Sequence, residues 1–151
     1  MRKSKSQTGK ARKRRSKCPL NIALEVFGDS WTLLVMRDIL FKGFGTFKEF
    51  SSSNEGMATN ILADRLKKMT ANGLITASRS NEDRRVMQYR PTPKGLDLAP
   101  VMLAMMLWTD KHEDHVVPAE KIARMAEDGD KFIAEALGQF GNMALPKIGG
   151  E

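Results

Sequence analysis

The chain has 151 residues, of which 41% are hydrophobic, enough to bury the core of one domain with an extension. Its 25 Lys and Arg outnumber its 18 Asp and Glu, and the resulting net charge of +7 favours an anionic partner such as nucleic acid. No apolar run reaches the roughly 18 residues of a membrane span, no secretion signal is visible, and the single Cys excludes an internal disulfide framework, so we expect a cytoplasmic protein without a membrane partner.

The basic excess is concentrated towards the N-terminal end. Residues 1–17 hold nine Lys and Arg, no acidic residue and almost nothing to bury, and they predict a disordered basic tail. Residues 30–95 carry eleven bases and six acids, whereas residues 96–151 carry five bases and ten acids. Because like charges repel, the acidic final third is not expected to contact phosphates.

The first predicted elements are three short helices. Pro19 lies in the first turn of the first helix and Gly28 ends it, which are positions that these residue types favour. Ser30 is expected to cap the second helix, at 31–41, whose widely spread apolar residues indicate a central place in the core. Thr46 is expected to cap the third.

A fourth helix and a charged hairpin follow. Gly73 is expected to end this helix in the left-handed conformation. Its inner stripe has spacings of four and three residues and consists of Leu62, Leu66 and Met69. Strands are predicted at 74–79 and 86–91, joined by the polar tip at 80–85. A helix followed by such a hairpin is typical of a winged helix-turn-helix, which is mainly α with a small β-hairpin.

A long helix is predicted to start at Thr92 and Pro93 and to run to His115. Apolar positions along it repeat at spacings near 3.5, as in the seam of a coiled coil. The seam consists of Leu98, Met102, Met105, Trp108 and His112. Because a second side is also apolar, we expect one side to pack on its own domain and the seam on a second subunit.

The segment 116–151 is predicted to be a helical extension, interrupted at Gly129, that takes part in dimerisation. Its expected apolar face consists of Ile122, Ala126, Ile133, Leu137 and Phe140. No internal repeat is visible in the chain.

The order of these motifs resembles that of HxlR-type, MarR-like winged-helix regulators. The resemblance covers about residues 18–112 and is carried by CPLNIALEVFGDSWTLLVMRDIL at 18–40, FKEF at 47–50, LADRL at 62–66, GLI at 73–75 and TPKG at 92–95. It implies that 18–115 form a DNA-binding domain and that the protein is a homodimer on a palindromic operator, where we expect it to act as a repressor. The family usually has Ser at the position of Ala58, where it caps the recognition helix, so we expect Thr59 to cap that helix here, one residue later. The wing here is closer to that of MarR proteins.

Eight residues are candidate contacts to double-stranded DNA: Thr46, Lys48, Thr59, Asn60, Ala63, Lys67, Arg84 and Arg85. An Asn on the outer face of the helix can bond an adenine edge, Thr and Ala can meet a thymine methyl, and Lys67 is expected on a phosphate. Arg65 is expected in a structural ion pair, while Asp64 either accepts from cytosine or pairs with Lys67 or Lys68. The two wing arginines are expected in the minor groove or on phosphate.

Cys18 is a candidate redox or electrophile sensor, because a helix N-terminus and nearby cations such as Lys17 lower a thiol pKa. The alternative is a thiol at a helix start with no signalling role. No metal or other cofactor is expected, since His112 and His115, although Glu113 and Asp114 lie between them, come without Cys and such pairs are more often surface or interface residues. Nothing resembles a catalytic constellation. Some of the ten Met residues could also line a pocket for a small apolar effector. Two alternative functions stay open, a general nucleic-acid binder and a protein-interaction module.

Overall fold

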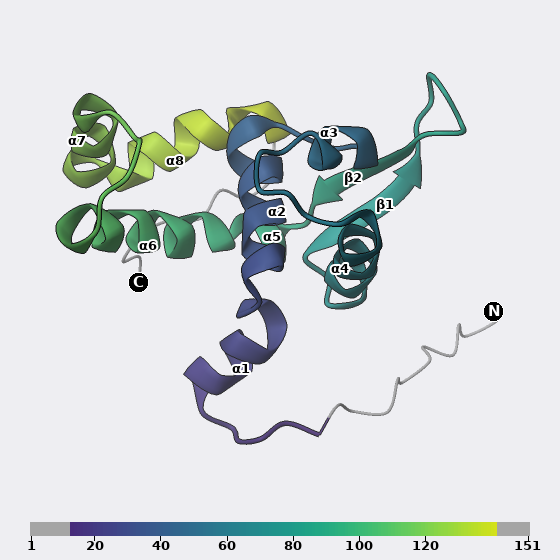
Figure 1. Ribbon diagram of the computed structural model, residues 1–151, viewed down its shortest axis with the longest axis horizontal. Coiled ribbons are helices and arrows are strands. Elements are labelled where there is room, and N and C mark those ends of the chain that lie inside the picture. Colours follow the sequence, from purple (N-terminus) through teal and green to yellow (C-terminus); the bar gives the residue numbers. More distant parts are fainter. Residues whose placement is uncertain (1–12, 142–151) are drawn as a thin grey trace.

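The computed structural model describes residues 13–141, which form a mainly helical body with one antiparallel hairpin (Figure 1). This confirms the predicted architecture. Residues 1–12 and 142–151 lie outside the described residues, and with them most of the predicted tail and the end of the predicted extension. Residues 13–17 carry no helix or strand, and Arg14 and the backbone of Arg15 contact Glu25.

Helices occupy the first three predicted segments, as α1 (Pro19–Phe27), α2 (Ser30–Lys42) and α3 (Phe47–Ser51). Asp29, not Ser30, caps α2, so that prediction was wrong. The Asp29 carboxylate accepts hydrogen bonds from the backbone N–H groups of Trp31 and Thr32, at 2.8 and 3.3 Å. A carboxylate suits this position better than a hydroxyl because its negative charge also interacts favourably with the positive end of the helix dipole.

Helix α4 (Thr59–Ala71) leads into strands β1 (Ile75–Arg79) and β2 (Met87–Pro91), which begin and end close to the predicted positions. Gly73 has a φ of 73° and provides the left-handed turn after the helix, as predicted. The residue at the N-cap is Ala58, which makes no side-chain bond. Thr59 already has helical backbone geometry, so the prediction that it caps α4 was wrong.

The hairpin is fastened at its base to the rest of the domain. In its register Ile75 faces Pro91 and Arg79 faces Met87. The backbone N–H of Tyr89 donates to the carbonyl of Gly45 at 2.8 Å, which adds the loop before α3 to the edge of the sheet. The Tyr89 ring also lies 6.1 Å from that of Phe50 in α3. The wing is therefore held by main-chain and aromatic contacts.

The long predicted helix is broken into α5 (Pro93–Leu96) and α6 (Leu98–His112). Pro100 explains the break, because proline has no N–H to donate to the carbonyl four residues earlier and its ring clashes with that carbonyl. That carbonyl belongs to Leu96, the last residue of α5. Asp97 makes the turn between the two helices.

The extension forms α7 (Ala119–Glu127), α8 (Gly129–Leu137) and the 3-10 turn η1 (Gly138–Phe140), with the predicted interruption near Gly129. Its buried residues are Ile122, Met125, Ile133 and Leu137. Met125 takes the place predicted for Ala126, which is exposed, because each short helix packs in its own orientation. These apolar residues pack on α2 and α6 of the same chain. A role of the extension in dimerisation stays a prediction.

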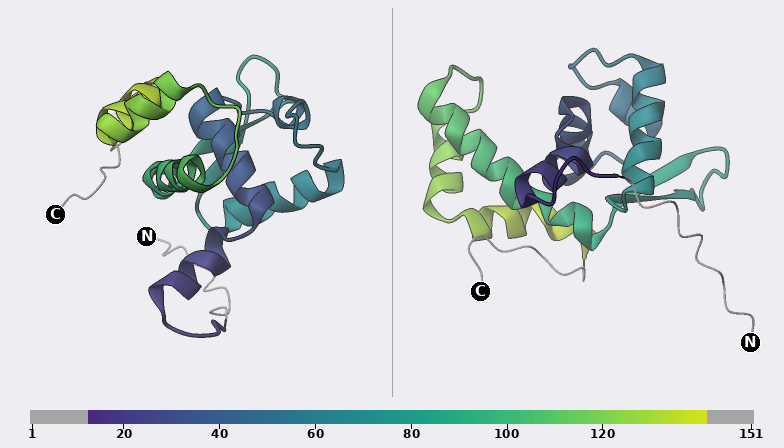
Figure 2. Two further views of the ribbon diagram at one scale, coloured as in Figure 1. Left: turned by 60° about the vertical axis from the view of Figure 1, so that its left-hand side comes forward. Right: turned by 90° about the horizontal axis from the view of Figure 1, so that it is seen from below.

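Helix α2 lies between two groups of elements (Figures 1 and 2). Helices α6 and α8 pack on one side of it, with α7 packed against those two helices, and α3, α4 and the hairpin lie on the other side. Val35, Met36, Ile39 and Leu40 of α2 are completely buried, as predicted for a central helix. Among residues 13–141, no helix is long and apolar enough to cross a bilayer.

Candidate nucleic-acid interface

Helix α4 separates a buried stripe from a polar face, as its sequence predicted. Leu62, Leu66 and Met69 are at most 2% exposed and fix the helix in the core. The residues that the structure brings together on its exposed side are Thr59, Asn60, Ala63 and Lys67. Because the buried stripe leaves the helix little freedom to rotate, the four side chains share a defined orientation.

Ion pairs organise the charges beside this polar face. Arg65 donates to Asp29 at 2.6 Å and also pairs with Asp64, which confirms its predicted structural role. Asp64 pairs with Lys68 at 3.1 Å, so of the two predicted lysine partners the structure selects the second. The Lys68 ammonium and the Arg65 guanidinium hold the pKa of Asp64 below its usual range. Lys67 is exposed and makes no ion pair with any described residue.

Thr46 caps α3 in a capping box with Glu49, which confirms the capping prediction. The hydroxyl of Thr46 accepts from the Glu49 N–H at 3.2 Å, and the Glu49 carboxylate accepts from the N–H groups of Gly45 and Thr46, both at 3.1 Å. This hydroxyl therefore already has a structural role, and its predicted DNA contact stays a prediction. Lys48, in the first turn of the same helix, is exposed.

The two arginines of the wing differ in their surroundings. Arg85 is paired with Asp83, with Nε at 3.1 Å and the backbone N–H at 3.0 Å from the same oxygen. These bonds lower the pKa of Asp83, and the carboxylate offsets part of the Arg85 charge. Arg84 is exposed and makes no ion pair within residues 13–141. Arg84 is thus the stronger candidate for a phosphate or minor-groove contact.

Two cations on the strands of the wing were not among the residues predicted from sequence. Arg79 and Arg90 are exposed and line an open pocket of about 720 Å³ together with Ser78, Glu82 and Gln88. The alternation of β-strand side chains could have found one of them: Arg90 pairs with Thr76 and shares a sheet face with Gln88 and Ser78. The two arginines add positive charge along the hairpin, which Glu82 in the same pocket partly offsets.

Cys18 occupies the N-cap of α1 and is exposed. The backbone N–H groups of Asn21 and Leu20 favour its thiolate and lower the pKa of the thiol, as predicted from its place at a helix N-terminus. The thiol is thus both accessible and favoured as the thiolate, the form that reacts. Its predicted role as a sensor stays a prediction.

The predicted dimer seam divides into a buried and an exposed part. Leu98 and Met102 are only 4% and 6% exposed and belong to the core of their own chain, so they do not form a continuous outer stripe with the rest. Met105 and Trp108 are 49% and 59% exposed, and the exposed His112 lies with its ring 5.0 Å from that of Trp108. The assignment of all five to a dimer interface therefore narrows to these three, for which it stays a prediction.

Helix α1 carries a second exposed apolar surface, which was not predicted from sequence. Leu20 and Leu24 are 68% and 56% exposed, four residues apart on one helix face. No residue of α1 is fully buried. Adjacent large apolar side chains left exposed on a helix are typical of interaction surfaces. The i, i+4 spacing was the available signal.

Both histidines are exposed and contact neighbouring side chains. His115 lies 2.9 Å from Asp110 and bonds the backbone of Val117. Within the part of the chain that is described, no group of three or more His, Cys, Asp or Glu could hold a metal ion.

Comparison with known proteins identifies the family. Residues 26–117 match the HxlR-like helix-turn-helix family. Over 90 residues the chain is 32% identical to an uncharacterised HTH-type transcriptional regulator of Mycobacterium bovis (strain ATCC BAA-935 / AF2122/97), a match that covers 60% of this chain and 56% of that regulator. The chain thus spans little more than half the length of this relative.

Two solved structures show the same fold. PA1607, a candidate transcription factor, superposes with a TM-score of 0.62 and 34% identity over 69% of this chain and 75% of its own. The reduced form of the transcriptional regulator YodB from B. subtilis gives a TM-score of 0.53 and 25% identity over 64% of this chain and 95% of YodB. YodB is also known in diamide-treated and quinone-bound forms. These similarities confirm the predicted winged-helix fold.

Proposed function

Because the chain belongs to the HxlR-like helix-turn-helix family, we propose that it is a transcriptional regulator that binds specific sequences in double-stranded DNA. The observation that carries this proposal is the polar face of α4, which is exposed although the opposite face is locked into the core. The cations of the wing lie on the hairpin that follows this helix.

In the proposed complex, α4 enters the major groove. A helix with side chains is about 10–12 Å across and the groove of B-DNA is about 12 Å wide. Asn60 bonds an adenine edge, Thr59 and Ala63 meet thymine methyl groups, and Lys67 contacts a phosphate. Arg84 on the wing contacts the minor groove or the backbone beside it.

We also propose that the protein acts as a homodimer on a palindromic operator. The exposed Met105 and Trp108 on α6, with Leu20 and Leu24 on α1, offer apolar surface that a second copy of the chain would bury. Two copies related by a two-fold axis would present two α4 helices to half-sites about 10–10.5 base pairs, or a multiple of that, apart. A dimer bound over a promoter excludes polymerase by occupancy, so repression is the proposed sense of control.

The proposed signal acts through Cys18. Its thiol is exposed and has a lowered pKa, and thiolates are the form that oxidants and electrophiles attack. The related regulator YodB, in its reduced, diamide-treated and quinone-bound forms, supports this assignment.

A general nucleic-acid binder is the second candidate, because residues 1–17 hold nine cations. Selection of duplexes from a random pool separates the two. A regulator is expected to enrich one motif and to bind it about a thousand-fold or more tighter than scrambled duplex at physiological salt. Equal, strongly salt-dependent affinity for both duplexes would favour the general binder, and no binding to duplex would favour a protein partner.

A further inference from the structure

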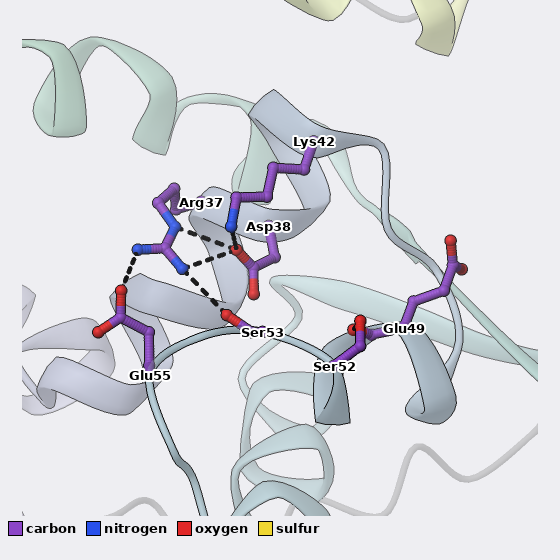
Figure 3. Close-up of polar contacts among 7 residues, drawn as sticks. All are labelled: Arg37, Asp38, Lys42, Glu49, Ser52, Ser53 and Glu55. Carbon is purple, nitrogen blue, oxygen red and sulfur yellow. Dashed lines mark hydrogen bonds and ion pairs between the residues drawn. The ribbon is translucent and has the colours of Figure 1, made fainter. Parts of the chain in front are cut away.

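The turn between α3 and α4 is tied to α2 by one arginine (Figure 3). Arg37 Nη1 donates to Glu55 Oε1 at 2.8 Å, and Nη2 donates to Ser53 Oγ at 3.3 Å. Both acceptors lie in the turn, whereas Arg37 belongs to α2. One side chain therefore connects the central helix of the core to the segment that leads into α4.

The guanidinium of Arg37 is itself fixed by a buried carboxylate. Its Nε and Nη2 donate to Asp38 Oδ1 at 3.0 and 2.8 Å, and Lys42 Nζ lies 3.2 Å from the same oxygen (Figure 3). Asp38 is only 2% exposed, and a carboxylate so deeply buried requires compensating cations. This requirement holds the Arg37 head in one place, with its remaining donors directed at the turn.

The start of α4 is anchored in the core by Leu62 but has no side-chain cap. Its N-cap residue, Ala58, makes no side-chain hydrogen bond to the first turn of the helix. Gly56, two residues earlier, has a φ of 68° and no neighbour near its Cα on the side where a Cβ would lie. Met57 is half-buried and packs against the core. Thr59 and Asn60 follow directly, so this turn adjusts the position of the proposed base-reading end within the orientation that the buried stripe of α4 fixes.

We propose that Arg37 and Glu55 are positioning residues that set the sequence discrimination of α4 and not its general affinity for DNA. The inference rests on the proposed function and deepens it. The two residues clasp the turn so that Asn60 meets a base edge at a defined angle, and base-edge bonds depend steeply on that angle. Bonds to phosphates depend less on angle because they are mainly electrostatic.

The negative charge of Glu55 allows a positioning role to be distinguished from simple repulsion of DNA. An acidic side chain near bound DNA repels phosphate, so a residue with no positioning role should, when neutralised, strengthen binding to every duplex alike. If the Arg37–Glu55 ion pair positions the turn, loss of Glu55 instead weakens binding to the preferred sequence relative to scrambled DNA. The Glu55 side chain is 40% exposed, so Glu55→Ala is compatible with an intact fold.

The test uses the full chain and a duplex that the unaltered protein selects from a random pool. Affinities for this duplex and for a scrambled duplex are measured at one salt concentration. Glu55→Ala and Arg37→Lys are each expected to reduce the ratio of the two affinities by about 5- to 20-fold, which is the lower part of the range for losing a single base-edge interaction. The double variant should show little further reduction beyond either single one, because both substitutions remove the same Arg37–Glu55 ion pair.

Lys42→Gln is the matched control, since Lys42 contacts the same Asp38 oxygen but not the turn. It is expected to lower thermal stability while leaving the affinity ratio unchanged. An unchanged ratio in Glu55→Ala, with stronger binding to both duplexes, would overturn the inference. If the unaltered chain selects no duplex at all, the proposed function itself fails, which is a separate and recognisable result.

Discussion

Helices α4 and α6 bury one side in the same core but expose different chemistry on the other. In α4 the exposed positions include Asn60 and Lys67, whereas in α6 they include Met105 and Trp108. Both helices show apolar residues at intervals of three and four, so periodicity alone makes them look alike. Their buried sides account for stability, and their exposed sides distinguish the partners we propose, DNA for α4 and a second protein copy for α6.

The largest effect on stability is expected from a substitution on the buried side of α4, the side that packs in the core. Leu66→Ala removes a side chain that is 2% exposed, and such cavities cost about 2–5 kcal/mol of unfolding free energy. Denaturant titration followed by circular dichroism measures this. Lys67→Ala, on the exposed side of the same helix, should change stability by less than about 0.5 kcal/mol. Equal costs for the two would mean that α4 is not held by its apolar stripe.

The exposed side of α6 is tested by Trp108→Ala. A large aromatic at the centre of a dimer interface contributes about 2 kcal/mol or more to association, so the variant should dissociate at concentrations where the unaltered chain is a dimer. Sedimentation at micromolar concentration provides the measurement. Lys111→Ala, in the last turn of the same helix, serves as control. A monomeric unaltered chain would remove α6 as an interface.

The exposed side of α4 is tested by comparing Asn60→Ala with Lys67→Ala. Removal of a bidentate base interaction costs about 1–3 kcal/mol of discrimination at one base pair per half-site. Removal of a phosphate-binding cation should weaken binding to all sequences equally and lower the slope of log affinity against log salt by about one unit. A panel of single-base operator variants separates these patterns, and their exchange between the two residues would show that the helix face is assigned wrongly.

Deletion of residues 1–17 extends the comparison to the basic tail. The deletion removes nine cations, and we expect the salt slope to fall by up to about 0.9 for each phosphate that the tail would otherwise neutralise, with little change in sequence preference. Binding isotherms at several salt concentrations supply both quantities. If discrimination between sites disappears with the tail, base reading is shared between the tail and α4.

The smallest effect is expected at Asp29, which joins α4 to the start of α2. Burial alone would raise the pKa of Asp29, but bonds from Arg65 and from the N–H groups of Thr32 and Trp31 hold it below its ordinary value. A carboxyl whose pKa is lowered by folding contributes stability above its unfolded pKa of about 3.9, and that contribution is lost as pH falls through the folded value.

Asp29→Asn keeps a side-chain oxygen for the cap of α2 and removes the charge facing Arg65. We expect a cost of less than about 1 kcal/mol at pH 7, as for partly exposed ion pairs, and a shallower loss of stability below about pH 4. Thermal melts across the acid range provide the measurement. An unaltered acid dependence in this variant would place the relevant carboxyl elsewhere.

The sequence by itself determined the elements whose cause is local. The stripe of Leu62, Leu66 and Met69, the left-handed turn at Gly73, the capping box of Thr46 and the hairpin all follow from interactions within a few residues or between adjacent segments. Such interactions are set by the 3.6-residue and two-residue periods of helix and strand, which are visible in any single chain. The outer face of α4 followed from the same local patterns, whereas the family followed from the resemblance of ordered motifs along the chain to those of known regulators.

Only the tertiary structure decided which side chains cover one another across the fold. Leu98 and Met102 share the seam spacing with Trp108, yet the first two pack in their own core and the third is exposed. The ion pair of Arg37 with Glu55 joins residues 18 positions apart, and that of Arg65 with Asp29 joins residues 36 positions apart. Periodicity specifies the face on which a residue lies, but burial and pairing depend on which element packs against that face, and that is a property of the folded chain as a whole.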